Sequence, residues 1–325
     1  MSNIKRAGAA ELRLPHPRRW QQQTSIPAPS HEDFISKFGD AFPEPKYLES
    51  DLGRTAVYNL EPRLTQKKRP ILMVHGIDTP ALGMLPLAKA LQALDPDAHI
   101  VLFDLWGDGL SSTPLVTHTP HIFHAQIHQV LGYMRWSSAH IVGYSFGGST
   151  VVSFANDNPW MCLSATLLAP AGLLQYDGFD AKMRKSLEDT SGEQDEMALD
   201  SVLDFLEDGP LNVPGDARDK MLNGEVVAEA LRAWELEDHP GHGHSMLSMF
   251  RHGGVYGQEA RFRRFASLAL RKFVIVGGTD PVCSKSQLTE LGLDNVEVVE
   301  NEGHAFIRSA ATQAARLLHD FLLQI

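Results

Sequence analysis

Hydrophobic residues along this chain fall into short continuous runs, and between the runs they recur at helical spacing. Runs without polar alternation are typical of strands that are buried on both faces of a parallel sheet. We predict such strands at 54–60, 69–76, 99–107, 139–145, 165–172, 272–280 and 295–301. Because helical segments separate most of these strands, the pattern predicts an α/β fold with helices on both faces of the sheet.

Helices are predicted between and after these strands. One begins at Thr79 with Pro80 at its first position, where a missing N–H costs nothing. A second covers 119–136 and carries an apolar stripe. Further helices are expected from Ser145 and at about 305–324.

The alternation of strands and helices is interrupted twice. Residues 1–45 are polar and rich in proline, which predicts an extended arm with one short helical patch at 31–38. Residues 172–260 contain acidic helical segments and no convincing strand, which indicates an inserted helical unit. The α/β core is therefore expected to comprise 46–171 and 261–325.

Composition limits the class of protein. Of the 325 residues, 43% are apolar and 21% are charged, as in soluble globular proteins. A formal charge of −11 argues against nucleic-acid binding and gives no support for attachment to an anionic membrane. Two cysteines make a disulfide framework improbable, and no signal-type segment or membrane span is evident, so a cytoplasmic location is expected.

A glycine-rich segment begins at the end of the strand predicted at 139–145. Gly143, Ser145 and Gly147 form the pattern G-x-S-x-G, which is typical of a sharp strand-to-helix turn carrying a nucleophilic serine. Side chains two positions before and after the serine would collide with neighbouring strands, and Gly148 would let the helix pack close to the sheet. We therefore predict Ser145 as a nucleophile in strained backbone geometry.

A serine nucleophile needs a base and an acid that orients the base. Asp280 and His304 follow the last two predicted strands, in the chain order Ser, acid, His. An oxyanion hole also needs two backbone N–H groups. We assign these to Phe146, which follows the nucleophile, and to Ile77, in the loop after the strand at 69–76.

These motifs resemble those of the α/β-hydrolase fold family with a helical cap, over residues 46–325. The resemblance is closest to capped fungal members of uncharacterised function, and it is carried by HG, FDLWGDGLSS, GYSFGG, LLAPAG, GGTDP and EGHAF. It implies a mostly parallel eight-stranded sheet, an all-helical cap at 172–260, and the roles assigned above to the catalytic residues. Asp108 departs from the family pattern, where a larger residue is common, which puts the transfer of a relative's substrate in doubt.

Other groups of this fold differ from this chain in the nucleophile or in the position of the catalytic acid. Dehalogenases and epoxide hydrolases of this fold carry an aspartate as nucleophile in the strand-to-helix turn, which is called the nucleophile elbow, whereas this chain carries Ser145. Some lactonases take the acid from the loop after the sixth strand, where the first carboxylate here is Asp177. Asp280 remains the better candidate for the catalytic acid than Asp177.

The cap is expected to roof the active site and determine specificity. Phe250 and the methionines of the segment 239–252 are expected as adaptable apolar lining, together with a histidine that touches substrate. Asp78 either faces the pocket or points outward at a helix start, the second being favoured. The candidate pocket residues are Gly76, Asp78, Trp234, His242, His244, Met246 and Met249.

No metal or organic cofactor is expected. His121, His124 and His128 lie opposite the apolar stripe of their helix, so we predict that they point to solvent. The histidines at 239–252 are interpreted as part of the cap rather than as metal ligands.

The sequence predicts hydrolysis of a carboxylic ester or lactone through an acyl-enzyme, with a mid-sized, largely neutral small molecule as substrate. Cleavage of a carbon–carbon bond in a β-diketone, or acyl transfer or cyclisation in secondary metabolism, would use the same triad and stays open. A non-catalytic ligand receptor on the same fold is the alternative of another class. Assembly into a homo-oligomer is left open.

Overall fold

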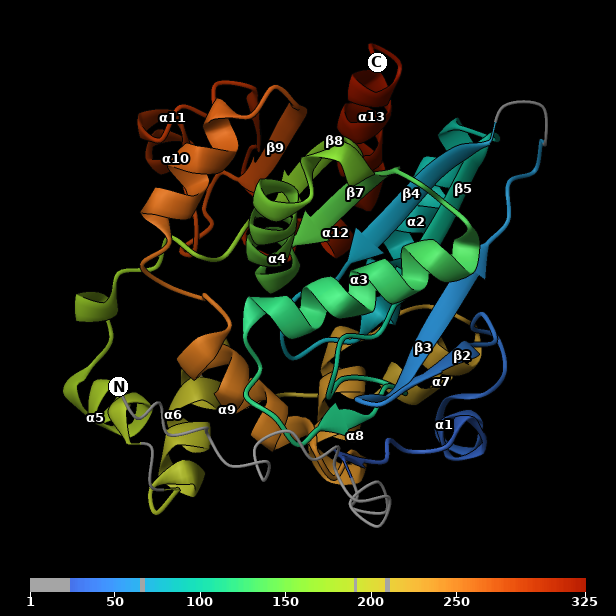
Figure 1. The fold of residues 1–325 in the computed structure, drawn as a ribbon. Helices are drawn as coiled ribbons and strands as arrows, with labels where there is room; N and C mark the ends of the chain where they lie inside the picture. Colours follow the sequence, from blue (N-terminus) through green and yellow to red (C-terminus); the bar gives the residue numbers. More distant parts are fainter. Residues whose placement is uncertain (1–23, 65–67, 190–191, 208–210) are drawn as a thin grey trace, which may run out of the picture.

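The computed structural model describes residues 24–64, 68–189, 192–207 and 211–325. Eight strands form the main sheet in the order β10-β9-β8-β7-β4-β5-β3-β2, and all neighbours are parallel except that β3 is antiparallel to both β2 and β5 (Figure 1). This confirms the predicted mostly parallel eight-stranded sheet. The strands are β2 Lys46–Ser50, β3 Gly53–Leu60, β4 Arg69–Val74, β5 Ala98–Phe103, β7 Ala139–Tyr144, β8 Cys162–Leu168, β9 Arg271–Gly277 and β10 Val296–Val299.

The edge strand β2 was not predicted from the sequence. It has one buried side chain, Leu48, among polar and exposed neighbours, because a strand at a sheet edge is covered less than a central strand. The central strands are buried on both faces. In β4, Leu72 and Val74 pack into the core on one side of the sheet, and Ile71 and Met73 pack into the core on the other side.

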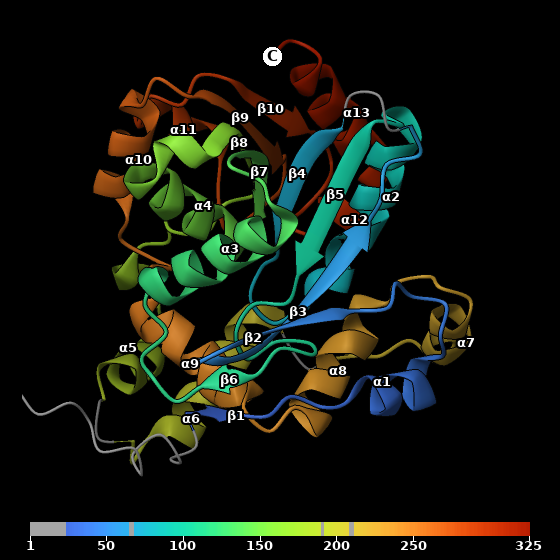
Figure 2. The same ribbon diagram turned by 45° about the vertical axis from the view of Figure 1, so that its right-hand side comes forward.

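Helices cover both faces of the sheet (Figure 2). On one face lie α3 Pro120–Met134, α4 Phe146–Asp157 and α10 Glu259–Ser267, and on the other lie α2 Leu85–Leu94, α12 Phe306–Ser309 and α13 Ala311–Leu322.

Two of the predicted helices differ from the sequence-based expectation. The helix expected from Thr79 begins as a 3-10 turn, η3 Ala81–Met84, and becomes α-helical only at Leu85. Pro86, which has no N–H to donate, is accommodated in the first turn of α2. The helix expected over 305–324 is divided into α12 and α13 at Ala310, whose φ of −119° is not helical.

The segment between β8 and β9 is helical in the described residues, and the described part of 172–260 holds no strand beyond an isolated bridge between Leu174 and Tyr256. In Figures 1 and 2 its helices gather beyond the carboxyl ends of the parallel strands. Its α-helices before α10 are α5 Ala181–Glu188, α6 Asp195–Glu207, α7 Ala217–Leu222, α8 Ala228–Asp238 and α9 His242–His252. The division into core and cap stays a prediction, and α10 begins at Glu259, next to the predicted boundary.

The described part of the arm is docked on the inserted helices. The predicted helical patch is α1 His31–Phe38, which begins with a capping box between Ser30 and Asp33. Phe34 and Phe38 both pack edge-on against Trp234 of α8, with ring centroids 5.3 and 6.2 Å apart. A short strand, β1 Ser25–Ile26, pairs with β6 Thr113–Pro114. The first half of the predicted arm, residues 1–23, lies outside the described residues.

No helix among the described residues is long and apolar enough to cross a membrane.

Candidate active site

Ser145 occupies the turn between β7 and α4 with a strained backbone, φ 53° and ψ −118°. Glycines make this turn possible. A Cβ on Gly147 would lie 2.1 Å from the carbonyl oxygen of Val74 in the neighbouring strand, as the sequence pattern predicts. A Cβ on Gly143 would instead meet the carbonyl oxygen of Gly147 at 2.3 Å, so the obstacle there is the first turn of α4 rather than a strand.

Three predicted residues come together at the carboxyl edge of the sheet. His304 Nε2 lies 2.9 Å from Ser145 Oγ, and His304 Nδ1 lies 3.0 and 3.1 Å from the carboxylate oxygens of Asp280. Asp280 follows β9 and its side chain is fully buried, whereas His304 follows β10 and its side chain is 27% exposed. Because the carboxylate accepts from Nδ1–H, Nε2 is left to accept the proton of the serine hydroxyl.

The two expected oxyanion donors lie beside this serine. Ile77 and Phe146 both line the cavity that contains Ser145. Within the described residues, neither backbone N–H donates to a protein acceptor. Both N–H groups are therefore available to a ligand.

His75 and Gly76 hold the loop that carries Ile77. His75 is buried, its Nε2 accepts from the Leu105 N–H at 2.7 Å, and its Nδ1 lies 2.6 Å from the Gly76 carbonyl oxygen. A Cβ on Gly76 would lie 2.9 Å from the Cβ of Ser145. His75 belongs to the HG motif, but its anchoring role was not predicted from the sequence, because its partner Leu105 follows the next parallel strand.

A mainly apolar cavity of about 420 Å³ opens against Ser145 and His304. Helices α6 and α9 supply part of its wall, so the inserted segment contributes to the site. The residues that line it are Ile77, Ser145, Phe146, Ala171, Leu174, Asp204, Phe205, Leu206, Phe250, Val255, Pro281, Val282 and His304.

None of the seven candidate pocket residues lines this cavity. Met246 and Met249 are buried in the core instead, and Phe250 is the expected apolar residue of α9 that faces the cavity. His244 lines a separate surface cavity, with its ring 5.9 Å from that of His118. Helical spacing identified the apolar positions of α9 but not the neighbour that each position faces.

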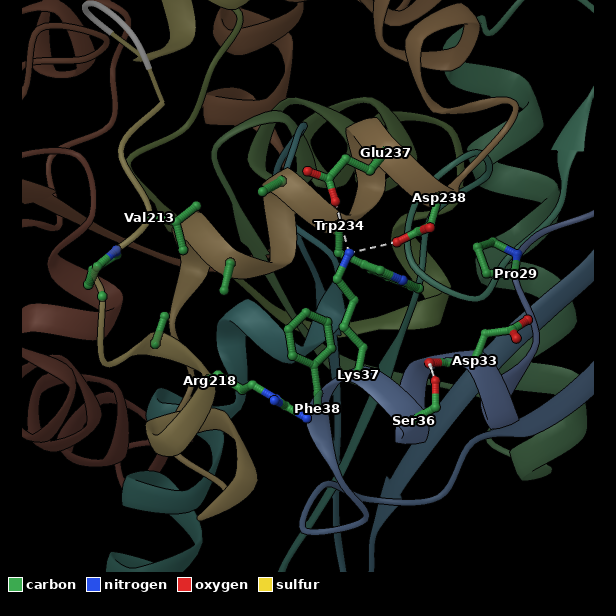
Figure 3. A pocket seen from close by; sticks show the side chains of 15 residues that line it. Pro29, Asp33, Ser36, Lys37, Phe38, Val213, Arg218, Trp234, Glu237 and Asp238 are labelled. Carbon is green, nitrogen blue, oxygen red and sulfur yellow. Dashed lines mark hydrogen bonds and ion pairs between the residues drawn. The ribbon is translucent and has the colours of Figure 1, made fainter.

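Trp234 lines another cavity, of about 750 Å³, between α1, α7 and α8 (Figure 3). Figure 3 shows Lys37 of α1 reaching Glu237 and Asp238 of α8, at 2.9 and 2.8 Å. Trp234 is therefore part of the contact between the arm and the inserted helices.

Asp78 and His242 are buried together, and neither lines the cavity that contains Ser145. Asp78 Oδ1 lies 3.2 Å from His242 Nε2, and Asp78 is 2% exposed, so it neither faces the cavity nor points outward. His242 Nδ1 lies 3.0 Å from Asp108 Oδ1. Asp108 is thus a partner of the inserted helix α9.

One of the three histidines on α3 is not where it was predicted. His121 and His128 are exposed, as expected, but His124 is 5% exposed and packs its ring against Phe154. Burial lowers the pKa of His124 to about 4. The helical wheel placed it opposite the stripe, but α4 covers that flank of α3 as well.

Comparison with known proteins identifies the family. A model of the alpha/beta hydrolase fold matches residues 69–307. The chain belongs to this family. It is 32% identical to a poly(3-hydroxyalkanoate) depolymerase of Ectopseudomonas oleovorans over 124 residues, which are 38% of this chain and 41% of that protein. It is 24% identical to a monoacylglycerol lipase of Xenopus laevis over 263 residues, 78% of this chain and 75% of that protein.

Solved structures of this hydrolase fold superpose on most of the chain. The superposition on the enol-lactonase of Burkholderia xenovorans LB400 covers 86% of this chain and 100% of that chain, with a TM-score of 0.64 and 17% identity. The meta-cleavage product hydrolase of Pseudomonas fluorescens IP01 has a TM-score of 0.61 and 18% identity, with 86% of this chain and 97% of that chain covered. At these identities the likeness concerns the fold.

Proposed function

We propose that this hydrolase-fold chain cleaves a carboxylic ester or lactone of a mid-sized, largely neutral small molecule. The observation that carries the proposal is the arrangement of His304, which bridges Ser145 and Asp280 at the wall of a mainly apolar cavity. Relatives named as a depolymerase and a lipase support the same class of reaction.

The geometry supports the following chemistry. Ser145 Oγ attacks the carbonyl carbon while its proton passes to His304 Nε2, and Asp280 stabilises the imidazolium through Nδ1–H. The N–H groups of Ile77 and Phe146 hold the negative oxygen of the tetrahedral intermediate. His304 then gives its proton to the leaving alcohol, and water that is deprotonated by the same imidazole releases the acyl group. No cofactor is needed for these steps.

The cavity supports a restricted range of substrates. A volume of about 420 Å³ suits a small molecule rather than a polymer chain, and the aromatic and aliphatic wall favours an apolar acyl group. Membership of a capped fungal branch, a cytoplasmic location and a homo-oligomeric state stay predictions.

The test is Ser145→Ala, assayed on p-nitrophenyl esters and with a fluorophosphonate probe. We expect kcat to fall by roughly 10⁴ to 10⁶ and labelling to disappear. Ser149→Ala is the matched control, because Ser149 lies in α4, the helix that follows Ser145, but donates its hydroxyl to the Gly254 carbonyl at 2.7 Å. Undiminished turnover by Ser145→Ala would refute the proposal. A panel of short esters, macrolactones and β-diketones separates ester cleavage from carbon–carbon cleavage.

A further inference from the structure

A second cluster of titratable residues lies where the inserted helices meet the core. Asp78 and Asp108 come from the loops after β4 and β5, and Glu235 and His242 come from α8 and α9. All four are at most 2% exposed. None of them lines the cavity that contains Ser145.

The surroundings of His242 require a positive charge. Its Nε2 lies 3.2 Å from Asp78 Oδ1, and its Nδ1 lies 3.0 Å from Asp108 Oδ1 and 3.1 Å from the Gly107 carbonyl oxygen. A neutral imidazole carries a single N–H, so one nitrogen lone pair would then face an acceptor oxygen. Either a proton or a metal ion on the ring removes this repulsion.

Two unsatisfied oxygens favour the metal ion. Asp108 Oδ2 and Glu235 Oε2 are buried and have no hydrogen-bond partner, and Oε1 of Glu235 already accepts from the Gly109 N–H at 2.6 Å. A buried polar oxygen without a partner has lost its hydration without compensation, so a bound cation would stabilise both oxygens. Protonating the ring of His242 supplies no partner to either oxygen, whereas a cation between the two carboxylates interacts with both side chains.

We propose that Asp108, Glu235 and His242 bind one divalent metal ion, of the Zn²⁺ type. One potential ligand atom from each residue lies within 4.8 Å of the other two. Zinc–ligand distances are about 2.0–2.2 Å, so ligand atoms on one ion lie roughly 3–4 Å apart. A mixed set of imidazole and carboxylate donors suits Zn²⁺ better than Mg²⁺ or Ca²⁺.

Asp78 acts as a positioning residue in this site. A metal-bound histidine usually donates its other ring N–H to a carboxylate, which fixes the ring, and Asp78 is that carboxylate for Nε2. The charges also balance, because two carboxylates and a neutral imidazole neutralise a divalent ion. Asp78 itself lies 3.8 Å from the guanidinium Nε of Arg232.

The ion would be structural. It joins the loop after β5 to α8 and α9, and so ties the inserted helices to the core. The site departs from the expectation, drawn from the sequence, that the histidines at 239–252 bind no metal. The sequence could not reveal it, because its ligands are distributed over three segments that are adjacent only in the fold.

The proposal is tested by the metal content and thermal unfolding of the full chain. We expect about one equivalent of zinc in protein dialysed against Zn²⁺, a lower Tm after chelation, and recovery of the Tm on adding Zn²⁺. Glu235→Gln should lose the bound zinc and the response of Tm to it. Glu237→Gln, on the same helix but exposed and paired with Lys37, should retain both.

A spectroscopic measurement keeps the test decisive if Glu235→Gln does not fold. Co²⁺ added to the chelated wild-type protein should give visible absorption bands that Zn²⁺ removes. The Ser145→Ala variant should bind the metal as wild type does, which separates this inference from the proposed hydrolysis. Protein that binds neither ion, and whose Tm does not respond to Zn²⁺, would overturn the proposal and leave a proton on His242 as the charge.

Discussion

At the scale of single residues, the glycines of this chain differ in what an added methyl group would meet. A Cβ on Gly147 would lie 2.1 Å from the Val74 carbonyl oxygen and 2.4 Å from that of His75, so strand and helix would have to separate. We expect Gly147→Ala to lower the free energy of unfolding by about 3 kcal/mol or more, or to prevent folding.

Gly132, in α3, provides the matched comparison because a methyl group added there would meet no described atom within 4 Å beyond its chain neighbours and its own helix backbone. Gly132→Ala should raise the free energy of unfolding by about 0.5–1 kcal/mol, since alanine loses less backbone entropy in a helix. Urea denaturation of both variants measures the difference. Equal stability of Gly147→Ala and wild type would contradict the account of the elbow.

The residues at the elbow and the triad could be predicted because each is fixed by local rules. Ser145 follows from glycine spacing, and Asp280 and His304 follow from their places after parallel strands, whose carboxyl ends meet at one edge. The conformation of Asp78, with φ 62°, and its burial beside His242 depend on contacts between distant segments. No periodicity in the chain encodes those contacts.

At the scale of elements, the inserted helices supply part of the wall of the cavity beside Ser145. Phe250 of α9 lines the cavity beside Ser145, whereas Met249, the adjacent residue, is fully buried in the core. Sequence periodicity predicted helices in this segment. It could not predict their faces, because α9 buries residues on more than one side.

Because Phe250 lines the cavity and Met249 does not, truncating these two side chains should affect specificity differently. Phe250→Ala should enlarge the cavity and shift the preferred acyl chain of p-nitrophenyl esters to longer ones, with a larger change in KM than in kcat. Met249→Ala should leave the ranking unchanged and lower the stability by about 2–5 kcal/mol. The ratio of kcat/KM values across acyl lengths checks both variants. An unchanged ranking for Phe250→Ala would mean that α9 does not contact the acyl group.

At the scale of the whole molecule, buried histidines should make stability depend on pH. His118, His124 and His140 all have their pKa lowered to about 4 by burial, from an ordinary value of 6.5. Between pH 6.5 and 4 the unfolded chain binds protons at these rings and the folded chain does not. Their contribution to stability is therefore fully present above pH 6.5 and is lost as the pH falls towards 4.

Each such histidine adds a slope of up to about 1.4 kcal/mol per pH unit to the free energy of unfolding in this interval. Chemical denaturation between pH 7.5 and 4.5 should show a steep loss of stability. His124→Gln should reduce the slope by about one proton because its ring is buried against Phe154. His121→Gln, three residues away on the exposed side of α3, is the matched control for removing a histidine from this helix. If the two variants titrate alike, His124 is protonated in the folded protein at mildly acidic pH, and its packing under α4 does not control its charge.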